Sequence, residues 1–255
     1  MKSKNIATVL FLLIAACGSL HAQDPLLELT FDSSFNGTGG EIPLSNSGAT
    51  LGPGVQATAA LFDIDDVVTY QSFGNIDSQS GTIDFVITPN WNGNDFQTHE
   101  FLVWDSLPED NGGGLLFSKD GANNLRQIFN RFSQDDQTEI GTAINVSDWI
   151  AFDPHYLAYS WSADERRLRQ YVDGQLVRDE EFPDGFILPT ITRSDFRLGS
   201  NTDGSLDELR IFDRELTPFE IEARFNSILS VPEPNSLLAL AVSSVVIVVR
   251  RTRRG

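Results

Sequence analysis

The chain has 255 residues, 40% of them hydrophobic, which is enough for one large domain or two small ones with a packed core. Its formal net charge is −18 and its pI is about 4.3, so the body of the protein is a poor partner for nucleic acid or anionic membranes, which bind clustered lysine and arginine. The single cysteine, Cys17, excludes a disulfide framework and a cysteine-ligated zinc site.

Residues 1–22 have the pattern of a secretory signal peptide. Lys2 and Lys4 precede the apolar stretch "IATVLFLLIAA", and Ala22 is a small residue at a suitable cleavage point. The chain is therefore expected to be exported. The alternative is a bacterial lipobox, which "IAAC" resembles, with a mature protein that begins at lipidated Cys17.

Residues 23–230 have the pattern of an all-β domain. "LELTF" at 27–31 and "GTIDFVITP" at 81–89 alternate apolar and polar side chains, as half-buried strands do, and Gly, Asn, Asp and Pro fill the gaps between such runs. Further predicted strands are "HEFLVWDS", "GGLLFSKD", "LRQIFNRF", "YLAYSWSA", "DFRLGS" and "LDELRIFD".

One hairpin and one helix stand out in the second half of the chain. Asp173-Gly174 is a favoured two-residue turn between the alternating runs of "RLRQYVDGQLVRDEEF". In "LTPFEIEARFN", Thr217 is the expected N-cap, Pro218 takes the first helical position and Glu220 completes a capping box. The pattern predicts a short C-terminal helix packed on the sheet.

Residues 231–255 form a separate tail. Its apolar or small run at 237–249 would be ~20 Å long as a helix, which is short for a bilayer core of about 30 Å. The order of a V-P-E-P motif, a marginal membrane segment and arginines resembles the PEP-CTERM sorting signal of exported bacterial proteins. The matching residues are Val231, Pro232, Glu233 and Pro234, then Arg250, Arg251, Arg253 and Arg254.

That resemblance implies recognition by an exosortase-type enzyme and transient insertion of the tail into a membrane. It implies delivery to the cell envelope, cell surface or extracellular matrix of a Gram-negative-type bacterium. A plain tail anchor is the alternative.

The domain itself resembles the laminin-G-like, concanavalin A-like lectin and glucanase domains. The resemblance lies in "WIAFDPHYLAYSWSADERRLRQYVDGQLV" and in the closing "FRLGSNTDGSLDELRIFDRELTPFEIEARF", and it spans most of residues 26–226. It implies a jelly-roll β-sandwich of two antiparallel sheets with one short C-terminal helix. The fold alone does not determine a function.

No catalytic constellation is visible in the sequence. A glucanase would need carboxylates on one strand at spacings that place them on the same face, and no E-x-D-x-x-E type pattern occurs. Asp207 and Glu208 are adjacent, and neighbours on a regular strand point to opposite faces. His99 and His155 each lack a partner at the spacing of metal ligands or of a catalytic triad.

A structural Ca²⁺ is the cofactor that the resemblance implies. Asp32, at the end of the first strand, and Asp207, in the closing "LDE", match positions where related domains supply oxygen ligands, and first and last strands of such folds are commonly neighbours. Asp32 could equally start a turn in "DSSFNG". Asp32 is therefore either a ligand of Ca²⁺ together with Asp207, or the first residue of a turn with no metal.

Carbohydrate binding is the leading functional hypothesis. Trp91 stands among turn residues with Asn92 and Asp95, so among the four tryptophans it is the best candidate for an exposed ring that stacks on a sugar while the polar side chains bind hydroxyls. The other three tryptophans lie in strand patterns and are expected in the core.

The hypothesis is a non-catalytic module that binds polysaccharide or a cell-surface glycoconjugate. The alternatives are a carbohydrate-active enzyme, either a glycosidase or a lyase, and a matrix protein without a ligand.

Overall fold

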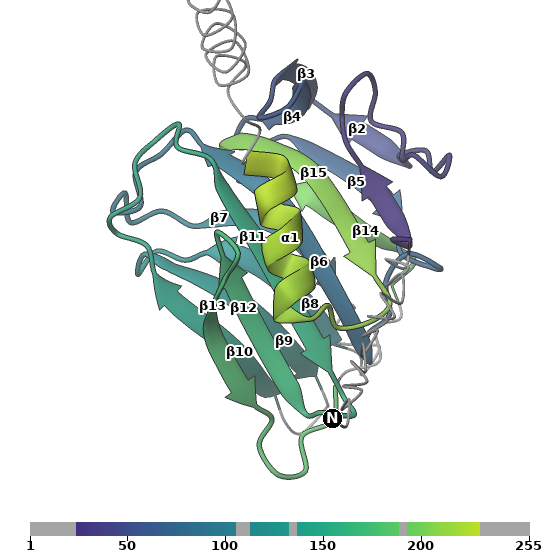
Figure 1. Ribbon diagram of the computed structural model, residues 1–255, viewed down its shortest axis with the longest axis vertical. Helices are drawn as coiled ribbons and strands as arrows, with labels where there is room; N and C mark the ends of the chain where they lie inside the picture. The colour runs from purple at the N-terminus through teal and green to yellow at the C-terminus, as the bar shows by residue number, and fades with distance from the viewer. Residues whose placement is uncertain (1–23, 106–112, 133–136, 189–192, 230–255) are drawn as a thin grey trace, which may run out of the picture.

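The computed structural model describes residues 24–105, 113–132, 137–188 and 193–229, which form two antiparallel sheets packed face to face with one helix outside them (Figure 1). Sheet A has the order β13-β12-β11-β6-β15-β4-β3, with β1 beside β15. Its strands are β13 (Gln175–Glu181), β12 (Arg167–Val172), β11 (His155–Ser162), β6 (Ser80–Pro89), β15 (Gly204–Phe212), β4 (Thr58–Phe62), β3 (Thr50–Pro53) and β1 (Leu27–Leu29).

Sheet B has the order β10-β9-β8-β7-β14-β5-β2. Its strands are β10 (Gln137–Asn145), β9 (Asn124–Phe132), β8 (Gly113–Lys119), β7 (His99–Asp105), β14 (Asp195–Gly199), β5 (Val67–Gln71) and β2 (Ser45–Ser47). All strand pairs in both sheets are antiparallel. The predicted all-β sandwich with a single short helix is confirmed.

The core lies between the sheets and follows the side-chain alternation of the strands. On β6, Ile83, Phe85 and Ile87 point into the large cluster between the sheets, while Asp84 and Val86 point to the outer face of sheet A. This division is the one that the period of two predicts. Sheet A is therefore apolar on both faces over part of its area, and its outer face needs a cover.

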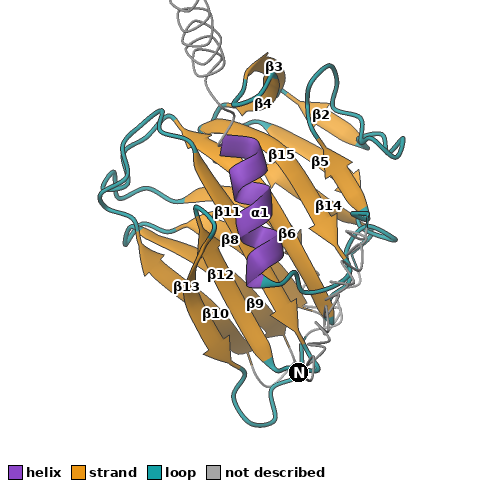
Figure 2. Ribbon diagram, in the orientation of Figure 1, coloured by secondary structure: helices purple, strands orange, loops and turns teal. Residues whose placement is uncertain are grey.

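The helix α1 (Pro218–Leu229) provides that cover (Figure 2). Its predicted capping box is present, because the Glu220 N–H donates to Thr217 Oγ1 (3.3 Å) and the Thr217 N–H donates to Glu220 Oε2 (2.8 Å). Arg224 reaches down to the buried carboxylate of Asp84, which also accepts the Tyr156 hydroxyl (3.0 Å). The helix is thus fixed to sheet A by apolar packing and by one buried ion pair.

Several local predictions are confirmed, and some strands were missed. Asp173 and Gly174 have φ values of 49° and 76°, as the predicted hairpin turn requires. β1 pairs with β15 from Leu27↔Ile211 to Leu29↔Leu209, so the first and last strands are neighbours. The strands between residues 45 and 71, which are only three to five residues long, and strand β10 were not predicted. Within the described residues, no helix is long and apolar enough to cross a bilayer.

Candidate functional site

Asp207 and Glu208 both belong to the outer face of sheet A, although they are neighbours on one strand. Leu206 and Leu209 both point into the core, so two residues separate inward side chains where regular alternation allows one. At this point the register of β15 against β6 shifts, and Glu208 has a φ of 52°. This β-bulge overturns the prediction that the two carboxylates point to opposite faces.

The bulge places a buried carboxylate beside the first strand. Asp207 Oδ2 accepts the Val55 N–H (3.0 Å), Oδ1 accepts the Glu208 N–H (2.9 Å), and the residue is 2% exposed. Burial raises the pKa of Asp207, and the negative charge of Asp32 raises it further against these hydrogen bonds. Burial likewise raises the pKa of Glu208, against the attraction of Arg210. The fold therefore brings the two predicted calcium ligands, Asp32 and Asp207, within electrostatic reach of each other.

The oxygen ligands at Asp32 and Asp207 suit Ca²⁺ in kind, since this ion takes carboxylate and carbonyl oxygens. Among the described residues, no three His, Cys, Asp or Glu side chains gather closely enough to hold a metal ion. The two aspartates would need main-chain carbonyl oxygens or water to reach the roughly six to eight ligands that Ca²⁺ takes. The pair fits the ion by ligand type and supplies only part of its shell.

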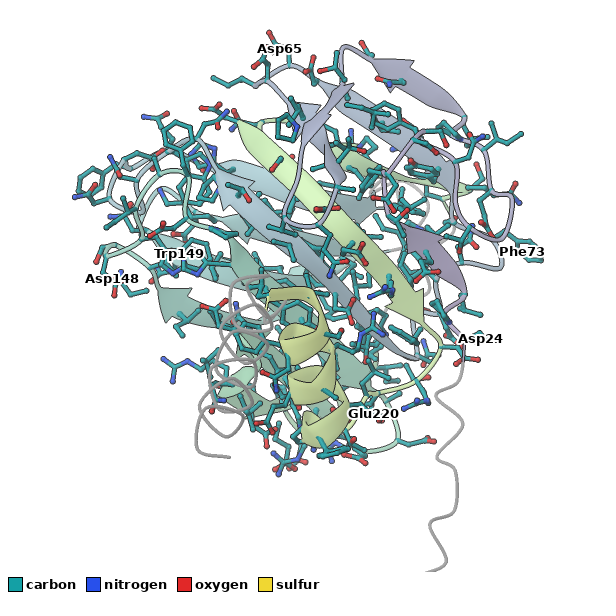
Figure 3. All side chains as sticks on the ribbon, turned by 45° about the horizontal axis from the view of Figure 1, so that its top comes forward. Asp24, Asp65, Phe73, Asp148, Trp149 and Glu220 are labelled. Carbon is teal, nitrogen blue, oxygen red and sulfur yellow. The ribbon has the colours of Figure 1, made fainter. Side chains whose placement is uncertain are left out.

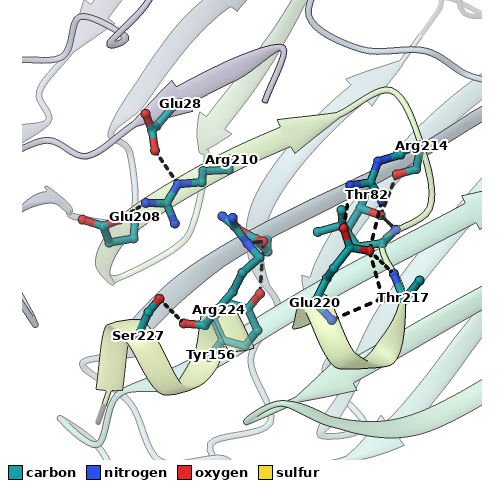
Figure 4. A network of polar contacts seen from close by, with 12 residues as sticks. Glu28, Thr82, Tyr156, Glu208, Arg210, Arg214, Thr217, Glu220, Arg224 and Ser227 are labelled. Atoms are coloured by element: carbon teal, nitrogen blue, oxygen red, sulfur yellow. Dashed lines mark hydrogen bonds and ion pairs between the residues drawn. The ribbon is translucent and has the colours of Figure 1, made fainter. Parts of the chain in front are cut away.

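Arginines close to this cluster are held by acidic partners (Figure 4). Arg210 Nε donates to Glu28 (2.5 Å) and Nη2 donates to Glu208 (2.8 Å), while Arg214 Nη2 donates to Glu220 (2.6 Å). All of these side chains except Glu208 line a pocket of about 450 Å³ between α1 and the first strand. Because the guanidinium groups are already paired, the contacts serve to join β1, β15 and the start of α1.

Trp91, the predicted sugar-stacking residue, is buried. Its side chain belongs to the core cluster, is 5% exposed and donates from Nε1 to the Thr202 carbonyl (3.0 Å). Its ring is nearly parallel to those of His99 and Trp149, with centroids 4.4 Å and 6.3 Å away. The prediction of an exposed ring at Trp91 is therefore wrong, because the rings of His99 and Trp149 and the main chain at Thr202 pack against it.

Asn92 and Asp95 serve to connect loops. Asn92 Oδ1 accepts the Ala151 N–H (3.0 Å) from the loop before β11. Asp95 Oδ1 accepts a hydrogen bond from the ammonium group of Lys119, whose side chain is fully buried. Asp95 Oδ2 lies 2.7 Å from His99 Nε2. Partial burial alone would raise the pKa of Asp95, but the hydrogen bonds from Lys119 and His99 outweigh it and lower that pKa. In this arrangement both predicted sugar ligands already have protein partners.

The other tryptophans behave as predicted. Trp104, Trp149 and Trp161 are 4%, 9% and 0% exposed and belong to the core. The predicted sorting residues, Val231, Pro232, Glu233, Pro234, Arg250, Arg251, Arg253 and Arg254, lie outside the described residues, as do residues 1–22.

A pocket that sequence patterns did not reveal opens at another side of the molecule. It has a volume of about 540 Å³, within the range of about 300–1,000 Å³ typical of small-ligand sites. Phe73 stands at this pocket and is 84% exposed; Figure 3 labels it on the side of the molecule opposite Trp149. We call it the Phe73 pocket, and its lining includes Ser72, Phe73, Asp77, Ser78, Trp104 and Arg193.

The loop that carries Phe73 is held by its neighbours in sequence and in space. The Ser72 hydroxyl donates to the Arg193 carbonyl (2.6 Å), and the Ser72 carbonyl accepts the N–H groups of Asn75 (2.9 Å) and Ile76 (3.1 Å). Gly74 has a φ of 82°, which a side chain would disfavour, and this lets the chain reverse directly after Phe73. The ring is thus held in solvent beside hydroxyl and carboxylate groups.

Comparison with protein families gives one match, covering residues 55–222, to the family described as the concanavalin A-like lectin/glucanases superfamily. No curated protein sequence matches the chain. Solved structures match in fold. The botulinum neurotoxin serotype G binding domain is 17% identical, with a TM-score of 0.59, over 79% of this chain and 50% of that one.

Two further solved structures are similar to the chain in fold. The serotype D ligand-binding domain in complex with N-acetylneuraminic acid is 12% identical, with a TM-score of 0.62, over 80% of this chain and 51% of that one. The botulinum neurotoxin DC binding domain in complex with rat synaptotagmin II is 15% identical, with a TM-score of 0.55, over 80% and 52%. The chain spans about half the length of these binding domains, and at such identities the similarity concerns the fold.

Proposed function

The chain belongs to the concanavalin A-like lectin/glucanase superfamily, and on that premise we propose that it is a non-catalytic module that binds carbohydrate in the Phe73 pocket. The observation that carries the proposal is an 84% exposed aromatic ring beside a pocket of ligand size. A flat ring of this kind can stack on the C–H face of a sugar while neighbouring polar groups bind its hydroxyls.

Binding is favoured over catalysis by the position of the acidic cluster. Asp207 and Glu208 have the raised pKa values that a general acid would need, but they are 2% and 6% exposed. A glycosidic bond would have to reach both groups, and the bulge that unites them is covered by neighbouring main chain and by Arg210. Their environment suits a structural role or a small cation better than a polymeric substrate.

A glycan array that includes neutral, uronic-acid and sialylated oligosaccharides, followed by calorimetry on the best ligand, tests the proposal. We expect Phe73→Ala to weaken binding at least about tenfold, since stacking on an aromatic ring contributes on the order of 1.5 kcal/mol. Phe219→Ala is the matched control, because Phe219 is 72% exposed at the pocket of about 450 Å³ beside α1, and weaker binding in this variant would move the site to that pocket.

Two outcomes would contradict carbohydrate binding at this pocket. The first is the absence of any glycan ligand with and without Ca²⁺. The second is unchanged affinity in Phe73→Ala, which would move the site elsewhere; loss in Asn92→Ala instead would place it at the loop of Trp91.

A bound Ca²⁺ between Asp32 and Asp207 is the second part of the proposal. It is supported by the pKa of Asp207, which burial raises and the negative charge of Asp32 raises further; a cation would offset that repulsion. We expect Ca²⁺ to raise the melting temperature over that in a chelator, because an ion that prefers the native state stabilises it. Asp32→Asn should abolish this rise and Asp65→Asn, at an exposed turn, should keep it. Equal melting temperatures in Ca²⁺ and in chelator would contradict a bound Ca²⁺.

Export and sorting complete the proposal. They are supported by the sequences of residues 1–22 and 231–255 alone, through which the chain would reach the cell envelope or matrix and meet an exosortase-type enzyme. Expression in a bacterium that has such an enzyme tests this. Replacing Pro232 and Pro234 by alanine should leave the tail attached, and identical processing with and without the two prolines would argue against the motif.

A further inference from the structure

Three large apolar side chains project from the loops that surround Trp91. Phe96, Ile150 and Phe152 are 70%, 61% and 70% exposed. They lie on residues 90–98 and 146–154, which together with the turn 120–123 we call the loop end (Figure 1). Exposed apolar residues that gather on neighbouring loops mark an interaction surface more often than residues scattered singly do.

The backbone holds two of these side chains outward at a cost. Phe96 and Phe152 have φ values of 59° and 69°, a region that bulky side chains rarely adopt. The Phe96 N–H donates to Asn123 Oδ1 (3.2 Å), and the Phe152 N–H donates to the Pro89 carbonyl (2.7 Å). The exposed rings are therefore fixed by the fold.

The loops themselves are rigidly joined, so the exposed side chains form part of one frame. The Val146 N–H donates to the Asn123 carbonyl (2.9 Å), and the Gly93 N–H donates to the Trp149 carbonyl (2.9 Å). A side chain on Gly93 would meet the Val146 carbonyl oxygen at 1.7 Å, so these two loops touch main chain to main chain. The trapped stack of Trp91, Trp149 and His99 lies beneath them.

The charge of the loop end is negative. Asp148 and Asp153 are exposed on it, and none of its three segments contains lysine or arginine. Lys119, at the end of β8, is buried against Asp95 and leaves no positive charge at the surface. An occupant of this surface should therefore combine apolar side chains with positive charge.

The chain itself contains a segment of that chemistry, and it begins beside the loop end. A pocket of about 400 Å³ is lined by Phe152 and Pro154 together with Ile228 and Leu229, the last residues of α1. The 26 residues that follow contain the apolar or small run at 237–249 and then four arginines. These residues combine apolar side chains with positive charge, as an occupant of the loop end should, and they follow directly after residues that lie beside it.

We propose that the loop end is the docking surface for the chain's own residues 231–255; that this segment is later transferred to a membrane rests on the sorting proposed above. Phe96, Ile150 and Phe152 would take its apolar side chains, and Asp148 and Asp153 would attract its arginines. This contact keeps an apolar tail from aggregating. It is independent of sugar binding, which is assigned to the Phe73 pocket.

Limited trypsin digestion of the chain with its tail intact tests this proposal. The rate measured is that of cleavage after Arg250 and Arg251. Phe96→Asn combined with Phe152→Asn should speed cleavage several-fold, and asparagine is chosen because it tolerates positive φ and so keeps the loops folded. The control is Phe73→Asn combined with Phe219→Asn, which removes equally exposed rings elsewhere.

A second arm tests the charges without touching the aromatic residues. Asp148→Asn combined with Asp153→Asn should also speed cleavage, and raising the salt concentration should bring the wild type toward this variant, because salt screens exposed charges. Equal cleavage rates in the wild type, both loop-end variants and the control would overturn the proposal. Faster cleavage in the control as well would overturn it too, since the effect would then not belong to this surface.

Discussion

Trp91 and Phe73 are aromatic residues in polar turns on different sides of the same sandwich, yet one is 5% exposed and the other 84%. Trp91 is covered because His99, Trp149 and the Thr202 carbonyl come from other parts of the chain to meet it. Phe73 stands on a loop whose hydrogen bonds hold the main chain and leave the ring in solvent. Turn composition therefore predicts a loop but not which side of the surface its ring occupies.

The largest effect on the free energy of unfolding is expected when each ring in turn is truncated to alanine. Trp91→Ala should lower the free energy of unfolding by about 3–5 kcal/mol, because it leaves a cavity in the core and an unpaired Thr202 carbonyl. Phe73→Ala should change it by less than about 0.5 kcal/mol, since an exposed side chain is removed. Urea unfolding followed by fluorescence and circular dichroism measures both. Equal losses in the two variants would break the comparison.

A second test compares one ion pair near each ring. Asp95→Ala leaves the fully buried ammonium of Lys119 without its carboxylate and should cost about 3 kcal/mol. Asp195→Ala removes one ion-pair partner of the partly exposed Arg193 and should cost at most about 1 kcal/mol. Lys119→Met in the Asp95→Ala background should recover part of the loss. If it recovers nothing, burial of the Lys119 charge is not the cause.

The smallest effect is the pH dependence of the Asp95 contribution. The pKa of Asp95 is lowered in the folded protein from the ordinary value of 3.8, so its ionised form stabilises the fold above that pH and the contribution is lost as the pH falls below it. The difference in unfolding free energy between wild type and Asp95→Asn should therefore shrink on acidification from pH 5 to about pH 3. A difference that stays constant over this range would mean that Lys119 and His99 do not favour the carboxylate.

Local patterns predicted the regular parts of the fold. The alternation in "GTIDFVITP" assigned Ile83, Phe85 and Ile87 to one face, and the Thr217–Glu220 box marked the start of the helix, because both signals depend on neighbours within a few residues. The short strands between residues 45 and 71 were missed, since β4 and β5 pair with the distant β15 and β14, and β2 and β3 pair with β5 and β4 in turn.

What the sequence by itself determined is the strand alternation of the sandwich, its hairpin and its capped helix, while the pairing of the first and last strands was expected from the resemblance to a family. Tertiary structure alone decided the site. Whether Trp91 is covered depends on contacts up to 111 residues away, and the facing of Asp207 and Glu208 depends on a bulge against β6. The physical reason is that the exposure of a side chain, and the sheet face to which it points, depend on which parts of the chain distant in sequence pack against it. A local pattern describes only the residue's own neighbours along the chain.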